Sequence, residues 1–255
     1  MELKSLKKRI NEGESVIGSW ITLAHPSIAE IMARSGFDWL AVDLEHSVIT
    51  IREAEELIRV IDLCGVSPLV RLTSNNPDQI KRVMDAGAHG VIVPMVMSAK
   101  DAELAVASVK YPMKGNRGIG LARAQGYGST FDEYFEWQQE NTLVIVQIEH
   151  IDAVNDIDAI FSVEGVDGFF IGPNDLSGSM NIPRQLDRKE YKDAVDKIKK
   201  AGQRHGVTSG IHVVEPNIEE FDTAIKDGFK FVAYSLDTRV LDVGFRSVFK
   251  ERNIK

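Results

Sequence analysis

The sequence predicts an α/β protein with the fold of a closed (β/α)8 barrel, and three observations support this fold class. Eight short apolar segments alternate with amphipathic segments along the 255 residues. Most of the apolar segments are continuous, as expected for parallel strands that are buried on both faces. A helical segment follows each of them, which is the alternation of a TIM barrel. A doubly wound open sheet is the alternative arrangement of the same elements.

The predicted strands and helices are distributed over the whole chain. The strands are Val16–Thr22, Trp39–Leu44, Pro68–Leu72, Gly90–Met95, Leu143–Glu149, Gly168–Gly172, Thr208–His212 and Phe231–Ser235. The helices between them are Ser27–Ser35, Ile51–Cys64, Pro77–Ala86, Ala99–Val109, Phe131–Glu140, Ala153–Phe161, Arg188–His205 and Ile218–Asp227, and a last helix covers Leu236–Lys255. The longest stretch without a predicted element is Tyr111–Thr130, and irregular stretches of this length are usually functional or disordered.

Capping residues mark where these helices begin and end. Thr50 precedes the helix at Ile51, and Asn76-Pro77 opens the next helix. Glycine follows the end of five helices, where the left-handed backbone that closes a helix favours it: Gly36, Gly65, Gly87, Gly206 and Gly228. No linker or low-complexity tract divides the chain, so residues 1–255 are predicted to form a single barrel domain.

Composition excludes several classes of protein. With 30 Lys plus Arg against 38 Asp plus Glu, the net charge of −8 argues against binding to nucleic acid or an anionic membrane. The single cysteine, Cys64, rules out a disulfide framework and a cysteine-based zinc site, and its helical setting favours a packing thiol over a nucleophile. There is no signal-peptide pattern and no apolar run long enough to span a bilayer, so we expect a cytoplasmic protein.

Polar residues gather at the carboxyl ends of the predicted strands, which form the active face of a (β/α)8 barrel. Glu149 and Asp175 follow neighbouring strands, where two carboxylates suit a hard divalent cation such as Mg²⁺ or Mn²⁺. The alternative is an exposed polar rim, or a helix from Leu176 that Asp175 caps. The turn Gly172–Ser177 either offers backbone N–H groups to a carboxylate or is only a tight strand-to-helix turn.

Two cationic or basic residues follow earlier strands. Arg71 would be costly to bury without an anion, so it pairs either with Asp43 or Glu45 or with a substrate oxyanion, and the substrate is favoured. His46 stands where a base is needed, although a lone histidine is more often structural. No lysine falls at a strand's carboxyl end, which disfavours Schiff-base chemistry.

These segments resemble a known family, the metal-dependent, pyruvate-using aldolases of the HpcH/HpaI type. The residues that carry the resemblance are Gly18-Ser19-Trp20, Phe37–His46, Val70-Arg71, Val83–Ala88, Val93–Val96, Tyr111-Pro112, Arg117–Gly120, Gln147–Glu149 and Phe170–Ser177. The resemblance covers nearly the whole chain. It implies a barrel of the phosphoenolpyruvate/pyruvate type, with the last helix packed on a partner subunit in a hexamer built as a trimer of dimers.

The resemblance also implies roles for individual residues. Glu149 and Asp175 would bind a divalent metal (Mg²⁺, Mn²⁺ or Co²⁺), Arg71 would contact the keto oxygen of pyruvate, and backbone N–H groups around Asn174 and Asp175 would hold its carboxylate. Gln147 and Trp20 would line the substrate pocket. His46 would be the acid/base residue, coupled to Asp85 of a neighbouring subunit. The reaction would be reversible aldol cleavage of a 4-hydroxy-2-oxo acid, of the 2-keto-3-deoxy-sugar-acid or dicarboxylate type, to pyruvate and an aldehyde through a metal-stabilised enolate.

Two residues depart from the family pattern, which usually has Ala at position 174 and a small or aliphatic residue at the end of strand seven. Asn174 adds a polar side chain beside the carboxylate cradle, and His212 adds an imidazole at the barrel mouth. We expect His212 either to bond a loop carbonyl or Glu215, or to contact the aldehyde, favouring a hydroxylated or carboxylated one. Two other functions remain open: a citrate-lyase-type acyl-CoA lyase or synthase on the same barrel, and a non-catalytic oligomeric scaffold.

Overall fold

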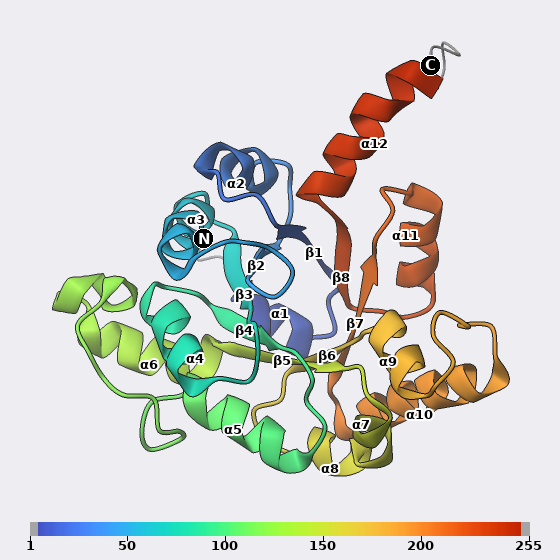
Figure 1. Ribbon diagram of the computed structural model, residues 1–255. Coiled ribbons are helices and arrows are strands. Elements are labelled where there is room, and N and C mark those ends of the chain that lie inside the picture. Colours follow the sequence, from blue (N-terminus) through green and yellow to red (C-terminus); the bar gives the residue numbers. More distant parts are fainter. Residues whose placement is uncertain (1–4, 251–255) are drawn as a thin grey trace.

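The computed structural model describes residues 5–250, and its eight strands close into one parallel barrel in sequence order (Figure 1). The strands are β1 (Val16–Ile21), β2 (Trp39–Asp43), β3 (Ser67–Arg71), β4 (Gly90–Val93), β5 (Leu143–Ile148), β6 (Gly168–Ile171), β7 (Thr208–Val213) and β8 (Phe231–Leu236). Each predicted strand is confirmed to within two residues at either end. Because β1 pairs with β8, the alternative of an open sheet is wrong.

Helices surround the barrel, as the alternating pattern predicts (Figure 1). Those confirmed are α2 (Pro26–Ala33), α3 (Ile51–Leu63), α4 (Pro77–Asp85), α5 (Ala99–Val109), α6 (Phe131–Asn141), α10 (Lys189–His205), α11 (Ile218–Lys226) and α12 (Asp237–Lys250). Thr50 forms a capping box with Glu53, and Asn76 caps α4 through its side chain. The last helix begins at Asp237, and its predicted residues 251–255 lie outside the described range.

Five short elements differ from the prediction. The segment expected as one helix, Ala153–Phe161, is two helices, α7 (Ile151–Asn155) and α8 (Ile157–Phe161), joined at Asp156. The helix α1 (Leu6–Asn11) and the 3-10 helix η1 (Arg123–Gly128) were not expected, and α9 (Pro173–Ser179) begins three residues before the Leu176 start considered from the sequence. Each is too short to show the helical periodicity from which the longer helices were predicted.

The barrel interior is filled with large aromatic side chains. Trp39 and Phe231 stack with their ring centroids 4.4 Å apart, and Trp20 and Phe170 pack beside them. Gly18 makes room for this cluster, because a Cβ at that position would lie 2.0 Å from the Trp39 ring. Helix α1 contributes Leu6 and Ile10 to the same cluster, in which residues from all eight strands except β7 take part. The interior is therefore a packed core, and any ligand must bind at a barrel end.

Helix α12 leaves the barrel instead of packing along it (Figure 1). Its start is fixed, because the buried Asp237 carboxylate accepts hydrogen bonds from the backbone N–H groups of Thr22 and Leu23 and from the Thr22 hydroxyl. Beyond this start the helix exposes apolar side chains: Val240, Leu241, Phe245, Val248 and Phe249. Within residues 5–250, no helix combines the length and the apolar character needed to cross a bilayer.

Candidate active site

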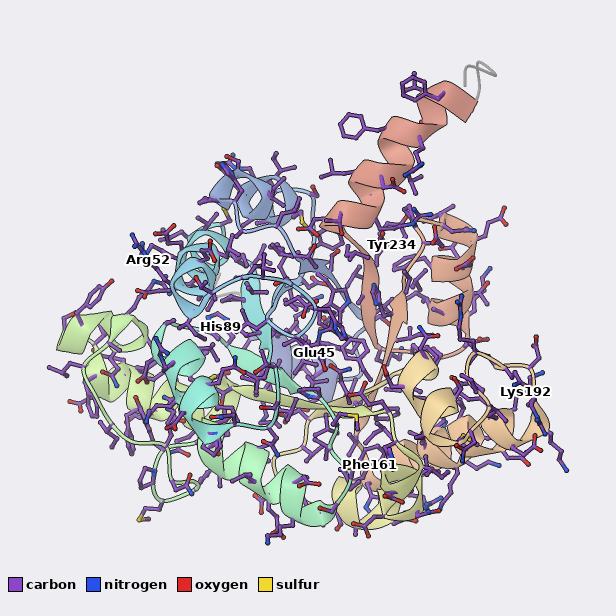
Figure 2. All side chains as sticks on the ribbon, in the orientation of Figure 1. Glu45, Arg52, His89, Phe161, Lys192 and Tyr234 are labelled. Atoms are coloured by element: carbon purple, nitrogen blue, oxygen red, sulfur yellow. The ribbon has the colours of Figure 1, made fainter. Side chains whose placement is uncertain are left out.

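A cavity of about 330 Å³ lies at the carboxyl ends of the strands, and we call it the mouth cavity. It brings together eight of the nine predicted site residues: Trp20, His46, Arg71, Gln147, Glu149, Asn174, Asp175 and His212. They come from six different strands or the loops that follow them, so only the closed barrel places them side by side. The ninth, Asp85, lies elsewhere. Glu45, next to the cavity, occupies the central part of the barrel in Figure 2, whereas Arg52 and Lys192 lie at the periphery.

The guanidinium of Arg71 is held by the carboxylate of Asp43. Arg71 Nε donates to Asp43 Oδ1 over 2.9 Å and Nη2 donates to Oδ2 over 2.6 Å, while Cζ lies 4.5 Å from the centroid of the Trp20 ring. Asp43 also accepts the backbone N–H groups of Glu45 and His46. The ion pair that the sequence left as one alternative for Arg71 is thus present, and the guanidinium still lines the mouth cavity.

Asp43 is a site residue that the predicted set lacks. It is the last residue of β2, its side chain is buried, and it lines the mouth cavity between Arg71 and the loop that carries His46. The register of the two strands is the signal that could have identified Asp43, because Asp43 and Arg71 are partners across the β2–β3 ladder. A carboxylate at a strand's last position, opposite an arginine on the next strand, therefore predicts such a pair.

Glu149 is buried, and both of its carboxylate oxygens are engaged. Oε1 accepts the backbone N–H of Met95 over 2.7 Å, and Oε2 accepts Gln147 Nε2 over 2.9 Å. Burial raises the pKa of Glu149. Gly172 is needed beside it, since a Cβ there would lie 2.5 Å from Glu149 Oε2. The carboxylate is thus fixed in orientation by its neighbours.

Asp175 lies opposite Glu149 on α9. This helix begins at Pro173 with Gly172 as its N-cap, so the expectation that Asp175 caps a helix starting at Leu176 is wrong. Asp175 instead falls within the first turn of the helix and is exposed. Pro173 favours the earlier start because its fixed φ suits the first helical position.

Glu45 adds a further carboxylate next to the mouth cavity. Its Oε2 is buried without a hydrogen-bond partner and lies 3.5 Å from Arg71 Nε. Burial raises the pKa of Glu45 to about 7, with Glu149, Asp43 and Asp175 contributing in the same direction and the Arg71 charge opposing. The site therefore holds more carboxylate charge than Arg71 alone can balance.

A divalent cation fits this donor set. Glu149 and Asp175 offer carboxylate oxygens, and the buried Oε1 of Gln147 has no hydrogen-bond partner among the described residues. No group of three or more His, Cys, Asp or Glu residues within 5–250 is arranged to hold a metal ion. Two protein carboxylates, with water and substrate completing the shell, is the coordination that Mg²⁺ commonly accepts.

His46 and His212 reach the mouth cavity in different environments. The His46 side chain is 66% exposed, with Nε2 3.9 Å from Glu45 Oε2. His212 is largely buried beside Trp20, at 5.6 Å between ring centroids, and its Nε2 lies 3.1 Å from the carbonyl oxygen of Ser235. Burial lowers the pKa of His212 to about 4. The ring bonds a carbonyl, as one of the two alternatives proposed, but Ser235 belongs to β8 and not to a loop, and Glu215 pairs with Arg239 instead.

Asp85 lies at the end of α4, outside the mouth cavity of its own subunit. Its Oδ1 is buried without a hydrogen-bond partner, and burial raises its pKa against the opposing charge of Arg117. Arg117 is itself 2% exposed, stacks 4.0 Å from the Tyr111 ring centroid and donates from Nη2 to the Tyr134 hydroxyl. Its Nε and Nη1 have no partner within the described chain, so this cluster is polar, buried and incomplete.

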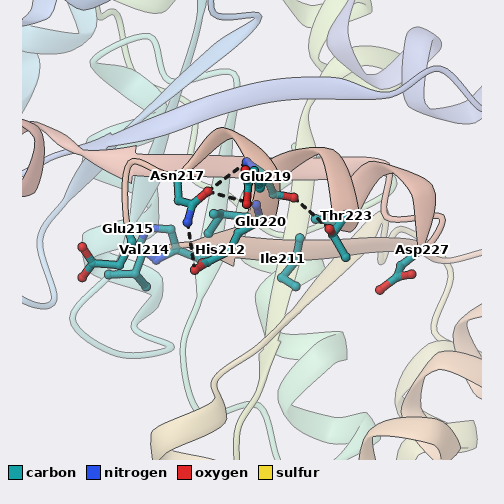
Figure 3. A pocket seen from close by; sticks show the side chains of 11 residues that line it. Ile211, His212, Val214, Glu215, Asn217, Glu219, Glu220, Thr223 and Asp227 are labelled. Carbon is teal, nitrogen blue, oxygen red and sulfur yellow. Dashed lines mark hydrogen bonds between the residues drawn. The ribbon is translucent and has the colours of Figure 1, made fainter.

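A second cavity, of about 640 Å³, lies between β7 and α11 and shares His212 and Val214 with the mouth cavity (Figure 3). The other polar side chains that line it are mostly carboxylates. Asn217, which also lines it, caps α11 by accepting the backbone N–H groups of Glu219 and Glu220. Of the nine predicted site residues, His212 alone lines this second cavity, and it was predicted to bind substrate. The mouth cavity is therefore the candidate active site.

Comparison with known proteins shows which family the chain is similar to. The family model described as HpcH/HpaI aldolase/citrate lyase matches residues 16–242. A hydroxypyruvate/pyruvate aldolase of Roseobacter denitrificans is 34% identical over 241 residues, covering 94% of this chain and 93% of that protein. A 2-keto-3-deoxy-L-rhamnonate aldolase of Salmonella gallinarum is 34% identical, covering 91% of this chain and 86% of that one.

Solved structures agree as well. The crystal structure of an HpcH/HpaI aldolase from Desulfitobacterium hafniense aligns with a TM-score of 0.88 at 31% identity, covering 98% of this chain and 96% of that one. The likeness therefore extends over nearly the whole chain.

Proposed function

The chain belongs to the HpcH/HpaI aldolase/citrate lyase family and is an aldolase, and we propose that it cleaves a 4-hydroxy-2-oxo acid reversibly to pyruvate and an aldehyde. The observation that carries the proposal is the joint position of Arg71, Glu149 and Asp175 in one cavity at the barrel mouth. Aldol cleavage leaves an enolate, and this arrangement is suited to stabilise its negative charge.

Arg71 is proposed to bind the keto oxygen of the pyruvate unit. Asp43 accepts hydrogen bonds from Nε and Nη2, so the orientation of the guanidinium is fixed before substrate arrives. Neither of these bonds uses Nη1. A preorganised cation of this kind stabilises a developing oxyanion without having to reorganise during the reaction. Gln147 helps to fix Glu149, and its free Oε1 is proposed to face the substrate.

Glu149 and Asp175 are proposed to hold a divalent cation (Mg²⁺, Mn²⁺ or Co²⁺), which would supply Lewis-acid stabilisation of the charge on the keto oxygen. The backbone N–H groups around Asn174 and Asp175 are proposed to hold the pyruvate carboxylate. His46, exposed at the rim, is proposed to move the proton on the hydroxyl that becomes the aldehyde oxygen.

Asp85 is proposed to act on the active site of a neighbouring subunit, because it lies outside its own mouth cavity. Helix α12 supports an assembly of subunits, since it leaves the barrel and exposes Phe245 and Phe249. We propose that α12 packs on a second copy of the chain and that such dimers form a hexamer.

The direct test is catalysis by the purified chain with Mg²⁺, Mn²⁺ or Co²⁺. Pyruvate C3–H exchange with deuterated solvent reports enolate formation alone, and aldol turnover with a panel of aldehydes reports the whole reaction. We expect both C3–H exchange and aldol turnover to require the cation. An acyl-CoA lyase is less well supported, because Arg71 is the only Lys or Arg among the described lining residues of the mouth cavity. Titration with CoA tests that alternative.

A further inference from the structure

We propose that the carbonyl of Ser235 fixes His212 as a hydrogen-bond acceptor in the mouth cavity, so that the enzyme selects neutral hydroxylated aldehydes over carboxylated ones. The inference rests on the proposed aldolase reaction and specifies its second substrate. It depends on three features of the described chain: a bulge in β8, the hydrogen bond of the His212 ring and the charges that line the cavity.

The bulge lies where β8 pairs with β1. Gly18 is the partner of Ala233 but Trp20 is the partner of Leu236, so the single residue between them on β1 faces two residues on β8. Ser235 in this bulge has a φ of 52°, in the left-handed region that non-glycine residues seldom occupy. Bulges of this kind redirect backbone groups and are frequent beside active sites.

Hydrogen bonds hold the bulge in place. The Ser235 hydroxyl donates to the carbonyl of Val214 over 3.0 Å, and the Ser235 carbonyl accepts the Ser19 hydroxyl over 3.2 Å. The same carbonyl lies 3.1 Å from His212 Nε2. The buried Ser235 thus connects β1, β7 and β8 at the barrel mouth.

This carbonyl determines the tautomer of His212. A carbonyl oxygen accepts hydrogen bonds and cannot donate them, so Nε2 must carry the hydrogen. Burial lowers the pKa of His212 to about 4, and the ring is neutral near pH 7. A neutral imidazole has one N–H, and Nδ1 therefore presents a lone pair. Among residues 5–250, the bond to Ser235 is the one hydrogen bond recorded for the ring.

The charges around His212 explain why a carboxylated aldehyde is disfavoured. The lining of the mouth cavity contains Asp43, Glu149 and Asp175, and its one Lys or Arg side chain is Arg71. Arg71 already pairs with Asp43 and is assigned to the pyruvate unit. A carboxylate on the aldehyde would therefore meet no free cation, and it would face the lone pair of Nδ1. A hydroxyl group can donate a hydrogen bond to that lone pair, so the cavity favours a hydroxylated aldehyde.

The experiment compares aldehydes that differ in one group. Lactaldehyde and propionaldehyde differ by a hydroxyl, and succinic semialdehyde adds a carboxylate. In the wild type with pyruvate and Mg²⁺, kcat/KM for lactaldehyde is expected to exceed that for propionaldehyde about tenfold, with succinic semialdehyde poorer than lactaldehyde. His212→Leu is expected to bring the lactaldehyde-to-propionaldehyde ratio near one, whereas His212→Asn, which is smaller but can place an acceptor near the position of Nδ1, is expected to retain most of the ratio. His205→Leu, on the exposed face of α10, is the matched control.

The ratio cancels any loss of pyruvate activation that the variants share. An unchanged ratio in His212→Leu, or a wild-type preference for succinic semialdehyde, would overturn the inference while pyruvate exchange still supports the aldolase reaction. Absence of C3–H exchange in the wild type would instead overturn the proposed function, and this inference with it.

Discussion

The carboxylate of Asp43 binds one edge of the Arg71 guanidinium and accepts hydrogen bonds from Nε over 2.9 Å and from Nη2 over 2.6 Å. Both residues end neighbouring strands, so the pair spans the β2–β3 ladder at the rim of the barrel. Asp43 also accepts the backbone N–H groups of Glu45 and His46. One buried carboxylate thus positions an arginine and the loop that carries the proposed acid/base residue.

Removing the charge of Asp43 is expected to damage activity and stability together. Asp43→Asn removes the buried charge that holds the part-buried Arg71 guanidinium, and breaking a fully buried pair costs about 3–5 kcal/mol, which is the upper bound here. We expect kcat/KM for aldol cleavage to fall at least about a hundredfold and the free energy of unfolding to fall by a few kcal/mol, measured by steady-state kinetics and urea denaturation. Asp62→Asn, which breaks the ion pair with Arg123 outside the mouth cavity, is the control and should spare kcat/KM. Full activity in Asp43→Asn would refute the positioning role.

Chelation tests the proposed metal site. EDTA is expected to abolish turnover reversibly, and Glu149→Gln or Asp175→Asn to lower kcat at least about a hundredfold by removing one of few protein ligands. Glu56→Gln, on the exposed face of α3, is the matched control. Metal content and activity are measured on the same samples. Turnover that survives exhaustive chelation would contradict the metal-dependent mechanism, and trapping with pyruvate and borohydride would point to a lysine instead.

Mixing two inactive variants tests whether the active site is shared between subunits. Asp85→Ala and His46→Ala are each expected to have low activity. The first variant lacks the residue that each subunit contributes to its neighbour's site, and the second lacks the acid/base residue with which that residue is coupled. Co-refolded mixtures are expected to regain a fraction of wild-type activity, since some sites then combine an intact Asp85 with an intact His46. Fully active monomers in solution would exclude the arrangement.

Protonation of His212 is expected to make stability depend on pH. The folded chain keeps the ring neutral to about pH 4, whereas the unfolded chain protonates it below about 6.5. Unfolding therefore takes up a proton between these values, and the unfolding free energy falls as pH falls from 6.5 to 4, by about 3 kcal/mol. Urea denaturation of His212→Leu should lack this part of the slope. His25→Asn, at an exposed helix cap, should keep it, and equal slopes in His212→Leu and wild type would contradict the burial of a neutral ring.

Charged residues on α12 are expected to break the assembly. Phe245 and Phe249 are 70% and 56% exposed in the single chain. If a second copy covers them, Phe245→Asp and Phe249→Asp bury a charge at the interface, and light scattering should report smaller particles than the wild type. Leu63→Asp, at an apolar residue that is 77% exposed at the end of α3, is the control and should leave the mass unchanged. An unaltered mass in all three variants would exclude α12 as the contact.

The sequence was sufficient to predict the strands and the residues at their ends, because continuous apolar runs and helix caps are local patterns. It did not locate the start of α9, whose seven residues are too few for a periodic signal, so the helix that it offered as an alternative began at Leu176 and left Asp175 before it. It left the Arg71 partner open because only the β2–β3 register puts Asp43 opposite. The left-handed Ser235 could not be predicted, since a serine carries no local signal for a positive φ.

Barrel closure by β1 and β8 has a consequence for synthesis of the chain. Asp237 and Thr22, which lock the seam, are 215 residues apart. During translation β1 emerges first and keeps an unpaired edge until β8 has left the ribosome, and unpaired strand edges attract other chains. Closure cannot occur before β8 has been synthesised, so the growing chain keeps this edge open until then. A chain truncated before Phe231 would be an open sheet with two free edges, prone to aggregate.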